Sequence, residues 1–159
     1  MRNIEPALKL IRQFEGFYSK PYLCPAGIPT IGIGTTAYPG GRPVDLLDPE
    51  ITEAQAMEYL KAHMKNDIKF LDDFLSRSSV QATDNQFCAL LSFAYNCGMA
   101  PIIREGKMIN KGLLTKDEKL IREGFMAYTM ATVNGKRTQL SGLLKRRKAE
   151  ADLFFKGGV

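Results

Sequence analysis

The residue best suited to chemistry is Glu15, which ends a helical pattern and is followed by Gly16. Apolar residues recur at helical spacing before it, with a proline in the first turn, at Ile4, Ala7, Leu8, Ile11, Phe14 and Pro6. This pattern predicts a helix over residues 4–15 that stops at Gly16. The negative end of the helix dipole disfavours an ionised carboxylate, so Glu15 is a candidate general acid.

Two further polar side chains follow Glu15 in a segment of different composition. Eight residues separate Glu15 from Cys24, and five separate Cys24 from Thr30, which opens the run Thr-Ile-Gly-Ile-Gly-Thr. Residues 16–50 are rich in glycine, proline and β-branched residues. They predict a small antiparallel sheet of short strands joined by tight turns.

The remainder of the chain predicts helices. Three pairs have capping-box spacing, namely Thr52 with Gln55, Thr83 with Gln86, and Thr115 with Glu118. The first pair opens a long helix over about 52–75, with an apolar stripe at Met57, Leu60, Met64, Ile68, Leu71 and Leu75. The second opens an apolar helix to about residue 96. Asn134-Gly135 predicts a turn and residues 140–155 a last helix, giving an α+β fold class.

Five ordered motifs cover nearly the whole chain, from about residue 4 to 155. Besides Glu15, Cys24 and Thr30 at their spacing, they are Pro21-Tyr22, the Thr-Ile-Gly-Ile-Gly run, and the segments 51–56, 92–98 and 142–151. Together they resemble the phage-type lysozymes, or endolysins. In that family a glutamate ends the first helix, an aspartate or sometimes a cysteine follows, and then a threonine.

This resemblance implies a single lysozyme-like domain over residues 1–159. We expect a β-rich lobe at about 16–50, the linking helix at about 52–75, and a helical lobe at about 80–155 packed with helix 4–15. It also implies a substrate cleft between the two lobes. The implied activity is hydrolysis of the β-1,4 bond between N-acetylmuramic acid and N-acetylglucosamine in peptidoglycan, with Glu15 protonating the glycosidic oxygen.

Cys24 stands where the family usually has aspartate, and its role stays open. A free thiol has a pKa of about 8.5, so only a few per cent is ionised at neutral pH. Cys24 could act as a thiolate base, as a nucleophile, or as a group that positions water together with Thr30. We favour water positioning, because it does not need full ionisation. Asp45, Asp48 and Glu50 are weaker substitutes, since none has the motif spacing.

The resemblance assigns further residues more weakly. Tyr95, Asn96 and Gly98 match a stretch that lines the cleft and binds substrate, although Asn96 could instead cap its own helix. Either Arg146 or Arg147 is a candidate partner of Glu15, with a solvated charge as the alternative. Thr35 occupies a position where many family members have a histidine of structural importance.

Composition excludes several other classes. The net charge is +5. Residues after 102 contain thirteen basic and six acidic residues, whereas residues 1–102 contain nine basic and eleven acidic residues. The dense run Lys145-Arg146-Arg147-Lys148 is interpreted as a solvated helix face, with attraction to an anionic envelope as a secondary effect. Three cysteines fit no disulfide framework, and Cys88 lies in a core pattern. With His63 as the only histidine, we expect no metal and no cofactor.

The expected location follows from the absence of a signal peptide or membrane-spanning pattern in the sequence. The resemblance implies accumulation in the host cytoplasm, passage through holes made by a holin, and action on peptidoglycan in the periplasm or cell wall. We expect a monomer that binds no nucleic acid.

Three other functions compete with a muramidase. A lytic transglycosylase needs one acid and no attacking water, so Cys24 slightly favours it. A non-catalytic wall-binding or phage-structural module on a lysozyme fold is disfavoured by the presence of both Glu15 and Thr30. A basic nucleic-acid binder is the weakest, since no such motif is present.

Overall fold

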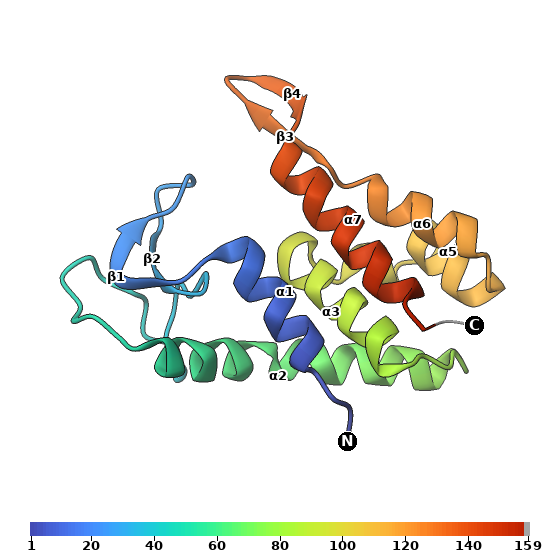
Figure 1. Ribbon diagram of the computed structural model, residues 1–159, viewed down its shortest axis with the longest axis horizontal. Helices are drawn as coiled ribbons and strands as arrows, with labels where there is room; N and C mark the ends of the chain where they lie inside the picture. The colour runs from blue at the N-terminus through green and yellow to red at the C-terminus, as the bar shows by residue number, and fades with distance from the viewer. Residues whose placement is uncertain (158–159) are drawn as a thin grey trace. The chain divides into compact units, whose positions relative to one another are not determined.

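The computed structural model describes residues 1–157 and divides into two compact units (Figure 1). One unit, called here the β unit, is Ile11–Asn66. The other, the helical unit, comprises Met1–Leu10 and Asp67–Val159. Helix α1 (Glu5–Glu15) and helix α2 (Glu53–Arg77) each run from one unit into the other. Helices and two small antiparallel sheets confirm the predicted α+β class. None of the helices described is both long and apolar enough to cross a membrane.

The sheet of the β unit is a two-stranded hairpin, as the composition of this segment predicted. Strand β1 (Tyr18–Leu23) pairs with β2 (Pro29–Gly32), and Tyr22 lies opposite Thr30. Gly32 has a φ of +67°, and a Cβ there would lie 3.0 Å from the Cβ of Ala56 on α2. Glycine at this position therefore allows both the left-handed backbone and the close approach of the strand to the helix.

Helices α2 and α3 (Asp84–Cys97) begin at the predicted capping boxes. The Gln55 side chain accepts from the Thr52 amide at 2.9 Å, and the Thr52 hydroxyl accepts from the Gln55 amide at 3.1 Å. Thr83 and Gln86 repeat this exchange at 2.9 and 3.1 Å. Most of α3 is buried, including Cys88, which confirms its place in the core.

The predicted cap at Thr115 is wrong. Thr115 is the last residue of α5 (Met108–Thr115), and its hydroxyl donates to the Lys111 carbonyl at 2.7 Å. Asp117 caps α6 (Glu118–Met126) instead, accepting from the Leu120 amide at 3.0 Å. Aspartate is at least as good an N-cap as threonine, so the nearer acid takes this position. Before α5 lies the short α4 (Ala100–Ile103).

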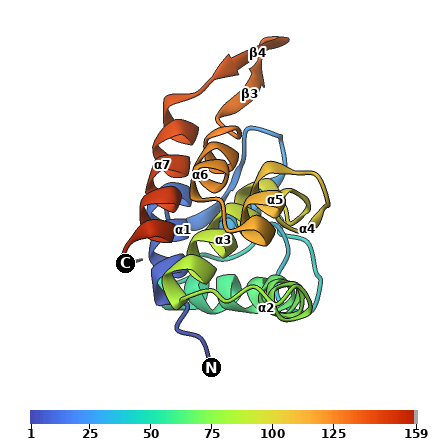
Figure 2. The same ribbon diagram turned by 90° about the vertical axis from the view of Figure 1, so that its right-hand side faces the viewer.

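A second hairpin was not predicted. Strand β3 (Met130–Val133) pairs with β4 (Lys136–Gln139) around the predicted turn at Asn134-Gly135. Both turn residues have positive φ, at +50° and +76°, as a tight two-residue hairpin turn requires. The hairpin projects past the ends of α6 and α7 (Ser141–Phe155), as Figures 1 and 2 both show.

Candidate functional site

Glu15 is the last residue of α1, where the sequence predicted it. The amide of Gly16 donates to the Arg12 carbonyl at 3.0 Å, and the φ of Gly16 is +76°. A left-handed glycine directly after the last helical residue is the usual way for a helix to end. Glu15 is half-buried, and β1 begins three residues after it, at Tyr18.

Cys24 lies in the tight turn between β1 and β2. Its amide donates to the Ile28 carbonyl at 3.1 Å, and its carbonyl accepts from the Gly27 amide at 2.8 Å. A backbone hydrogen bond from Ile28 is the main cause that lowers the pKa of the Cys24 thiol, helped by the Ala26 backbone and the Thr30 hydroxyl. The turn therefore stabilises the thiolate, because its donors stabilise negative charge on sulfur.

Thr30 connects this turn to the sheet. Its side chain is only 2% exposed, and its hydroxyl donates to the Ile28 carbonyl at 2.9 Å. A hydrogen bond from the same hydroxyl to a Cys24 thiolate is one of the causes that lower the pKa of Cys24. A hydroxyl has one proton and two lone pairs, so it donates either to the Ile28 carbonyl or to a Cys24 thiolate. The protonation of Cys24 and the orientation of the Thr30 hydroxyl are thus coupled.

Glu15 and Cys24 both lie close enough to Tyr22 for their charges to affect its pKa. Burial is the main cause that raises the pKa of the Tyr22 hydroxyl, and the negative charges of Tyr18, Glu15 and Cys24 add to it. The rings of Tyr18 and Tyr22 lie 4.2 Å apart. The β unit therefore gathers a carboxyl, a thiol, a buried hydroxyl and a phenol. Sequence reasoning noted Tyr22 only as a motif residue, although its position opposite Thr30 follows from a short hairpin.

Two of the three alternative carboxylates of the β unit, Asp45 and Asp48, have structural partners. Asp48 accepts from the Tyr38 hydroxyl at 2.7 Å and from the Asp45 amide at 2.8 Å, and it pairs with Arg42 at 3.2 Å. The Asp45 backbone hydrogen bond is the main cause that lowers the pKa of Asp48, and burial with the Asp48 charge raises the pKa of Tyr38 to about 12. Asp45 in turn accepts from the Leu47 amide at 2.8 Å. These acids order their own loop.

Thr35 and His63 also lie in ordered positions of the β unit. Thr35 is 1% exposed and exchanges backbone hydrogen bonds with Ile31 at 2.9 and 3.0 Å. The His63 ring contacts the Ala37 carbonyl at 2.5 Å. Both contacts hold the loop that follows β2, which fits the structural interpretation of position 35.

The substrate-binding candidates of the helical unit lie at the end of α3. Gly98 ends the helix with a φ of +82°, and its amide donates to the Ala94 carbonyl at 2.7 Å. Tyr95 is half-buried, and Asn96 is exposed. The Asn96 Oδ1 atom accepts from Nη1 of Arg147 at 2.9 Å and from the Cys97 thiol at 3.6 Å. Asn96 is thus held by Arg147, and its role toward a sugar stays a prediction.

Arg146 and Arg147 are buried, so the interpretation of 145–148 as a solvated face is wrong for these two. They are 4% and 0% exposed. Nε of Arg147 donates to Glu150 at 2.7 Å and Nε of Arg146 at 3.5 Å, while the Ser92 hydroxyl donates to Glu150 at 2.6 Å. Burial is the main cause that raises the pKa of Glu150, and both arginines oppose it. Sequence reasoning missed Glu150, although its spacing from the arginines matches helical ion pairs. The pairing of either arginine with Glu15 stays a prediction.

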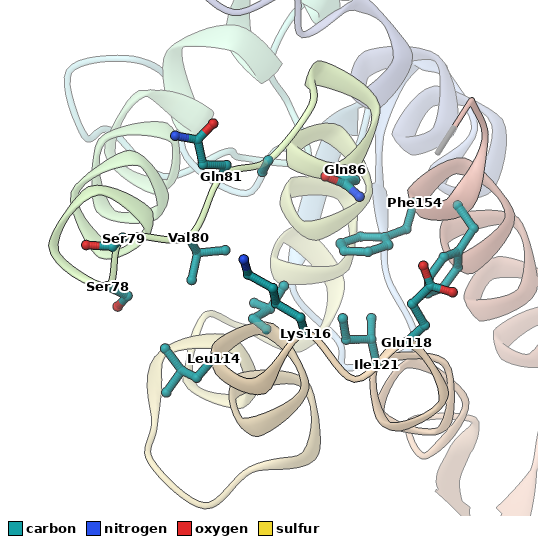
Figure 3. A pocket seen from close by; sticks show the side chains of 13 residues that line it. Ser78, Ser79, Val80, Gln81, Gln86, Leu114, Lys116, Glu118, Ile121 and Phe154 are labelled. Carbon is teal, nitrogen blue, oxygen red and sulfur yellow. The ribbon is translucent and has the colours of Figure 1, made fainter. Parts of the chain in front are cut away.

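A hollow of about 270 Å³ lies elsewhere in the helical unit, between the loop after α2, the junction of α5 and α6, and the end of α7 (Figure 3). Val80, Ile121 and Phe154 line it with apolar side chains, and Lys116 and Gln86 line it with polar ones. It contains none of the predicted site residues. Among the described residues, no group of three or more histidine, cysteine or acidic side chains is arranged to hold a metal ion.

Comparison with known proteins agrees with the motif pattern. Residues 12–150 match the family described as phage lysozyme. The chain is 35% identical to the endolysin of Acyrthosiphon pisum secondary endosymbiont phage 1, over 97% of this chain and 98% of the relative. It is 30% identical to the endolysin of Salmonella phage P22, over 91% of each. The solved endolysin of Escherichia coli O157:H7 phage FAHEc1 is 32% identical, with a TM-score of 0.82 over 99% of this chain and 95% of that one. The chain therefore belongs to the phage lysozyme family and has a lysozyme-like fold.

Proposed function

We propose that this protein is an endolysin of the muramidase type. It hydrolyses the β-1,4 bond between N-acetylmuramic acid and N-acetylglucosamine in bacterial peptidoglycan. Membership of the phage lysozyme family supports lysis of cell walls by a glycosidase. The observation that carries the finer assignment is that one short turn holds Cys24 and Thr30, lowers the pKa of the Cys24 thiol, and lies close enough to Tyr22 for Cys24 and Glu15 both to affect the Tyr22 pKa.

In this proposal Glu15 is the general acid. A carboxyl group at the end of α1 donates its proton to the glycosidic oxygen as the bond breaks. Positive charge then develops on the sugar ring, as in glycosidases with paired acidic groups. A nearby anion stabilises that charge, and a thiolate at Cys24 supplies one without a second carboxylate.

Cys24 and Thr30 position the attacking water. The buried Thr30 hydroxyl is fixed by the sheet, and the turn holds the Cys24 sulfur beside it. Both atoms accept a hydrogen bond from water when the Thr30 proton points to the Ile28 carbonyl. The lowered pKa of Cys24 increases the fraction of thiolate that can take a proton from that water. This supports hydrolysis over a transglycosylase, which needs no attacking water.

The test is clearing of purified, outer-membrane-free bacterial walls by the native chain and by Glu15→Gln, Cys24→Ala and Cys24→Asp. We expect the native chain and Cys24→Asp to clear walls, and Glu15→Gln to lose at least a hundredfold in rate. Cys88→Ala is the matched control, because Cys88 is a buried core thiol. Equal clearing by the native chain and Glu15→Gln would contradict the assignment of the acid.

Mass analysis of the released fragments distinguishes the competing functions. Reducing ends that have gained water indicate a muramidase, and 1,6-anhydro ends indicate a lytic transglycosylase. Binding to walls without release of sugar would indicate a non-catalytic module. We further propose action as a monomer on peptidoglycan outside the cytoplasmic membrane, after release through a holin. Sedimentation of the purified chain and lysis with and without a holin in the same host test these two points.

A further inference from the structure

The hollow between the loop after α2, the junction of α5 and α6, and the end of α7 contains none of the proposed catalytic residues (Figure 3). It has a volume of about 270 Å³, lies within the helical unit and is called here the Lys116 hollow. Its lining residues include Val80, Gln86, Leu113, Lys116, Ile121 and Phe154. Three segments that are distant in the sequence therefore meet around one space.

Apolar side chains form the floor of this hollow. Leu113, Ile121 and Phe154 are 5%, 4% and 4% exposed, so the surrounding protein shields them from bulk water. Water beside such groups finds few polar partners, whereas an apolar group gains free energy by leaving water. A dry cavity of about 150 Å³ can hold one benzene ring. The Lys116 hollow therefore has room for a short aliphatic chain.

Two strained backbone positions border the same hollow. Within residues 1–157, three residues other than glycine have a positive φ, namely Ser79 at 55°, Lys116 at 57° and Asn134 at 50°. The β3–β4 turn explains Asn134, whereas Ser79 and Lys116 both line the hollow. Lys116 follows the last residue of α5, where glycine or asparagine is usual. Strain of this kind clusters at ligand-binding and catalytic positions.

The loop side of the hollow offers a cation and a hydrogen-bond donor. Figure 3 shows the Lys116 side chain extending toward Val80 and Gln86. The Lys116 ammonium has no ion pair with any residue that the structure describes. Gln86 accepts from the Thr83 amide through Oε1, so its Nε2 group remains as a donor. A cation and an amide donor beside an apolar floor suit an aliphatic chain that ends in an anion.

The charge of the lining favours one small anion over an anionic membrane surface. Of the described residues that line the hollow, Lys116 is the only cation and Glu118 the only acid. Glu118 lies nearer α7, away from the loop toward which Lys116 extends (Figure 3). Attraction to anionic lipids needs a cluster of several basic residues, and this lining has no net charge. The geometry fits one carboxylate at the Lys116 end.

We propose that the Lys116 hollow binds the monomeric anion of an aliphatic carboxylic acid. The chain packs on Leu113, Ile121 and Phe154, and the carboxylate accepts from the Lys116 ammonium and from Nε2 of Gln86. Because the ligand contacts all three segments around the hollow, it stabilises the helical unit. This site goes beyond the proposed function, since the ligand takes no part in the cleavage of peptidoglycan.

The experiment uses octanoate below its micelle concentration as the probe, with two-dimensional amide NMR of the full chain. Lys116→Gln removes the charge and keeps a side chain of similar length. Lys119→Gln is the matched control, because Lys119 is exposed on α6 and does not line the hollow. We expect Lys116→Gln to raise the Kd of octanoate about fivefold and Lys119→Gln to raise it less than about twofold. The native chain and Lys116→Gln should bind uncharged 1-octanol alike.

The position of the site and its effect on stability are measured in the same samples. Octanoate should shift the amide signals of residues 78–86, 113–121 and 154–155, and at ten times its Kd it should raise the Tm by about 3 °C or more. Signal shifts confined to other residues, or equal effects of the two substitutions, would overturn the inference. It would also fail if phosphatidylglycerol vesicles retained the native chain but not Lys116→Gln while octanoate caused no shift, since the site would then recognise a membrane surface. None of these measurements depends on wall clearing, so their outcome is independent of the proposed function.

Discussion

Removing the negative charge of Glu150 should destabilise the helical unit strongly. Glu150 and Arg147 are both 0% exposed and lie 2.7 Å apart, with Ser92 and Arg146 as further partners of the same carboxylate. In Glu150→Gln the shape is kept, but the buried guanidinium of Arg147 loses its counter-charge. Breaking one partner of a buried pair costs about 3–5 kcal/mol, because the other charge stays out of water.

The chain contains a matched control for this substitution. Glu58 and Lys61 on α2 have the same three-residue spacing at 3.6 Å, but their side chains are 73% and 43% exposed. An exposed pair contributes about 0–1 kcal/mol. Glu58→Gln should therefore lower the free energy of unfolding by under about 1 kcal/mol. The difference between the two variants isolates the effect of burial.

Urea unfolding followed by far-UV circular dichroism measures both free energies of unfolding. At this chain length, about 1 kcal/mol corresponds to about 2–4 °C in Tm, so Glu150→Gln should melt about 10 °C lower. A loss below about 1 kcal/mol in Glu150→Gln would refute the reasoning. It would mean that burial, which raises the pKa of Glu150, has already neutralised the carboxyl group in the folded protein.

Three further outcomes test the β unit. Alkylation of Cys24 by iodoacetamide should reach half its maximal rate at lower pH than alkylation of an ordinary thiol, because hydrogen bonds from the turn lower the pKa of Cys24. Cys88 should need a higher pH, because burial raises its pKa. Mass mapping after short exposures at several pH values measures both rates. Thr30→Val should move the pH dependence of Cys24 alkylation to higher pH and slow wall clearing, since it removes a donor to the thiolate. An unchanged pH dependence would exclude that hydrogen bond. Gly32→Ala should lower the free energy of unfolding by about 2–4 kcal/mol, because it combines backbone strain at positive φ with a steric clash. Gly27→Ala is the control: it also has positive φ but open space around it, so it should cost only about 1 kcal/mol. Equal losses in urea unfolding would contradict the packing argument.

The parts of the fold that were predictable depend on local sequence. Helix α1 and the starts of α2 and α3 followed from apolar spacing and capping residues, which act within a few positions of the chain. The β3–β4 hairpin was missed because its four-residue strands are largely exposed and lack apolar alternation. Only its turn, Asn134-Gly135, carries a strong local preference. The cap of α6 also depends only on nearby residues, but Thr115 and Asp117 are both good capping residues, so the sequence did not distinguish between them.

The site residues also divide into those that local sequence predicted and those that depend on packing between helices. Glu15, Cys24 and Thr30 could be selected because their elements are short and adjacent in the chain. The burial of Arg146 and Arg147 could not, since it depends on α3 and α7 packing together. The spacing of these residues from Glu150 is compatible with either an exposed ion pair or a buried one. Only the packed helices decide between them, and they place Ser92 as a third partner.

The turn after β1 explains how a thiol at position 24 can be shifted toward its negatively charged form. The donors that lower the pKa of Cys24 belong mainly to the backbone of Ile28 and Ala26, and only one belongs to a side chain, that of Thr30. Backbone donors stabilise negative charge on whichever side chain occupies the turn. A carboxylate would be ionised there in any case, whereas a thiol depends on these donors. The backbone of the turn therefore supports negative charge at position 24, and a thiol needs that support more than a carboxylate would.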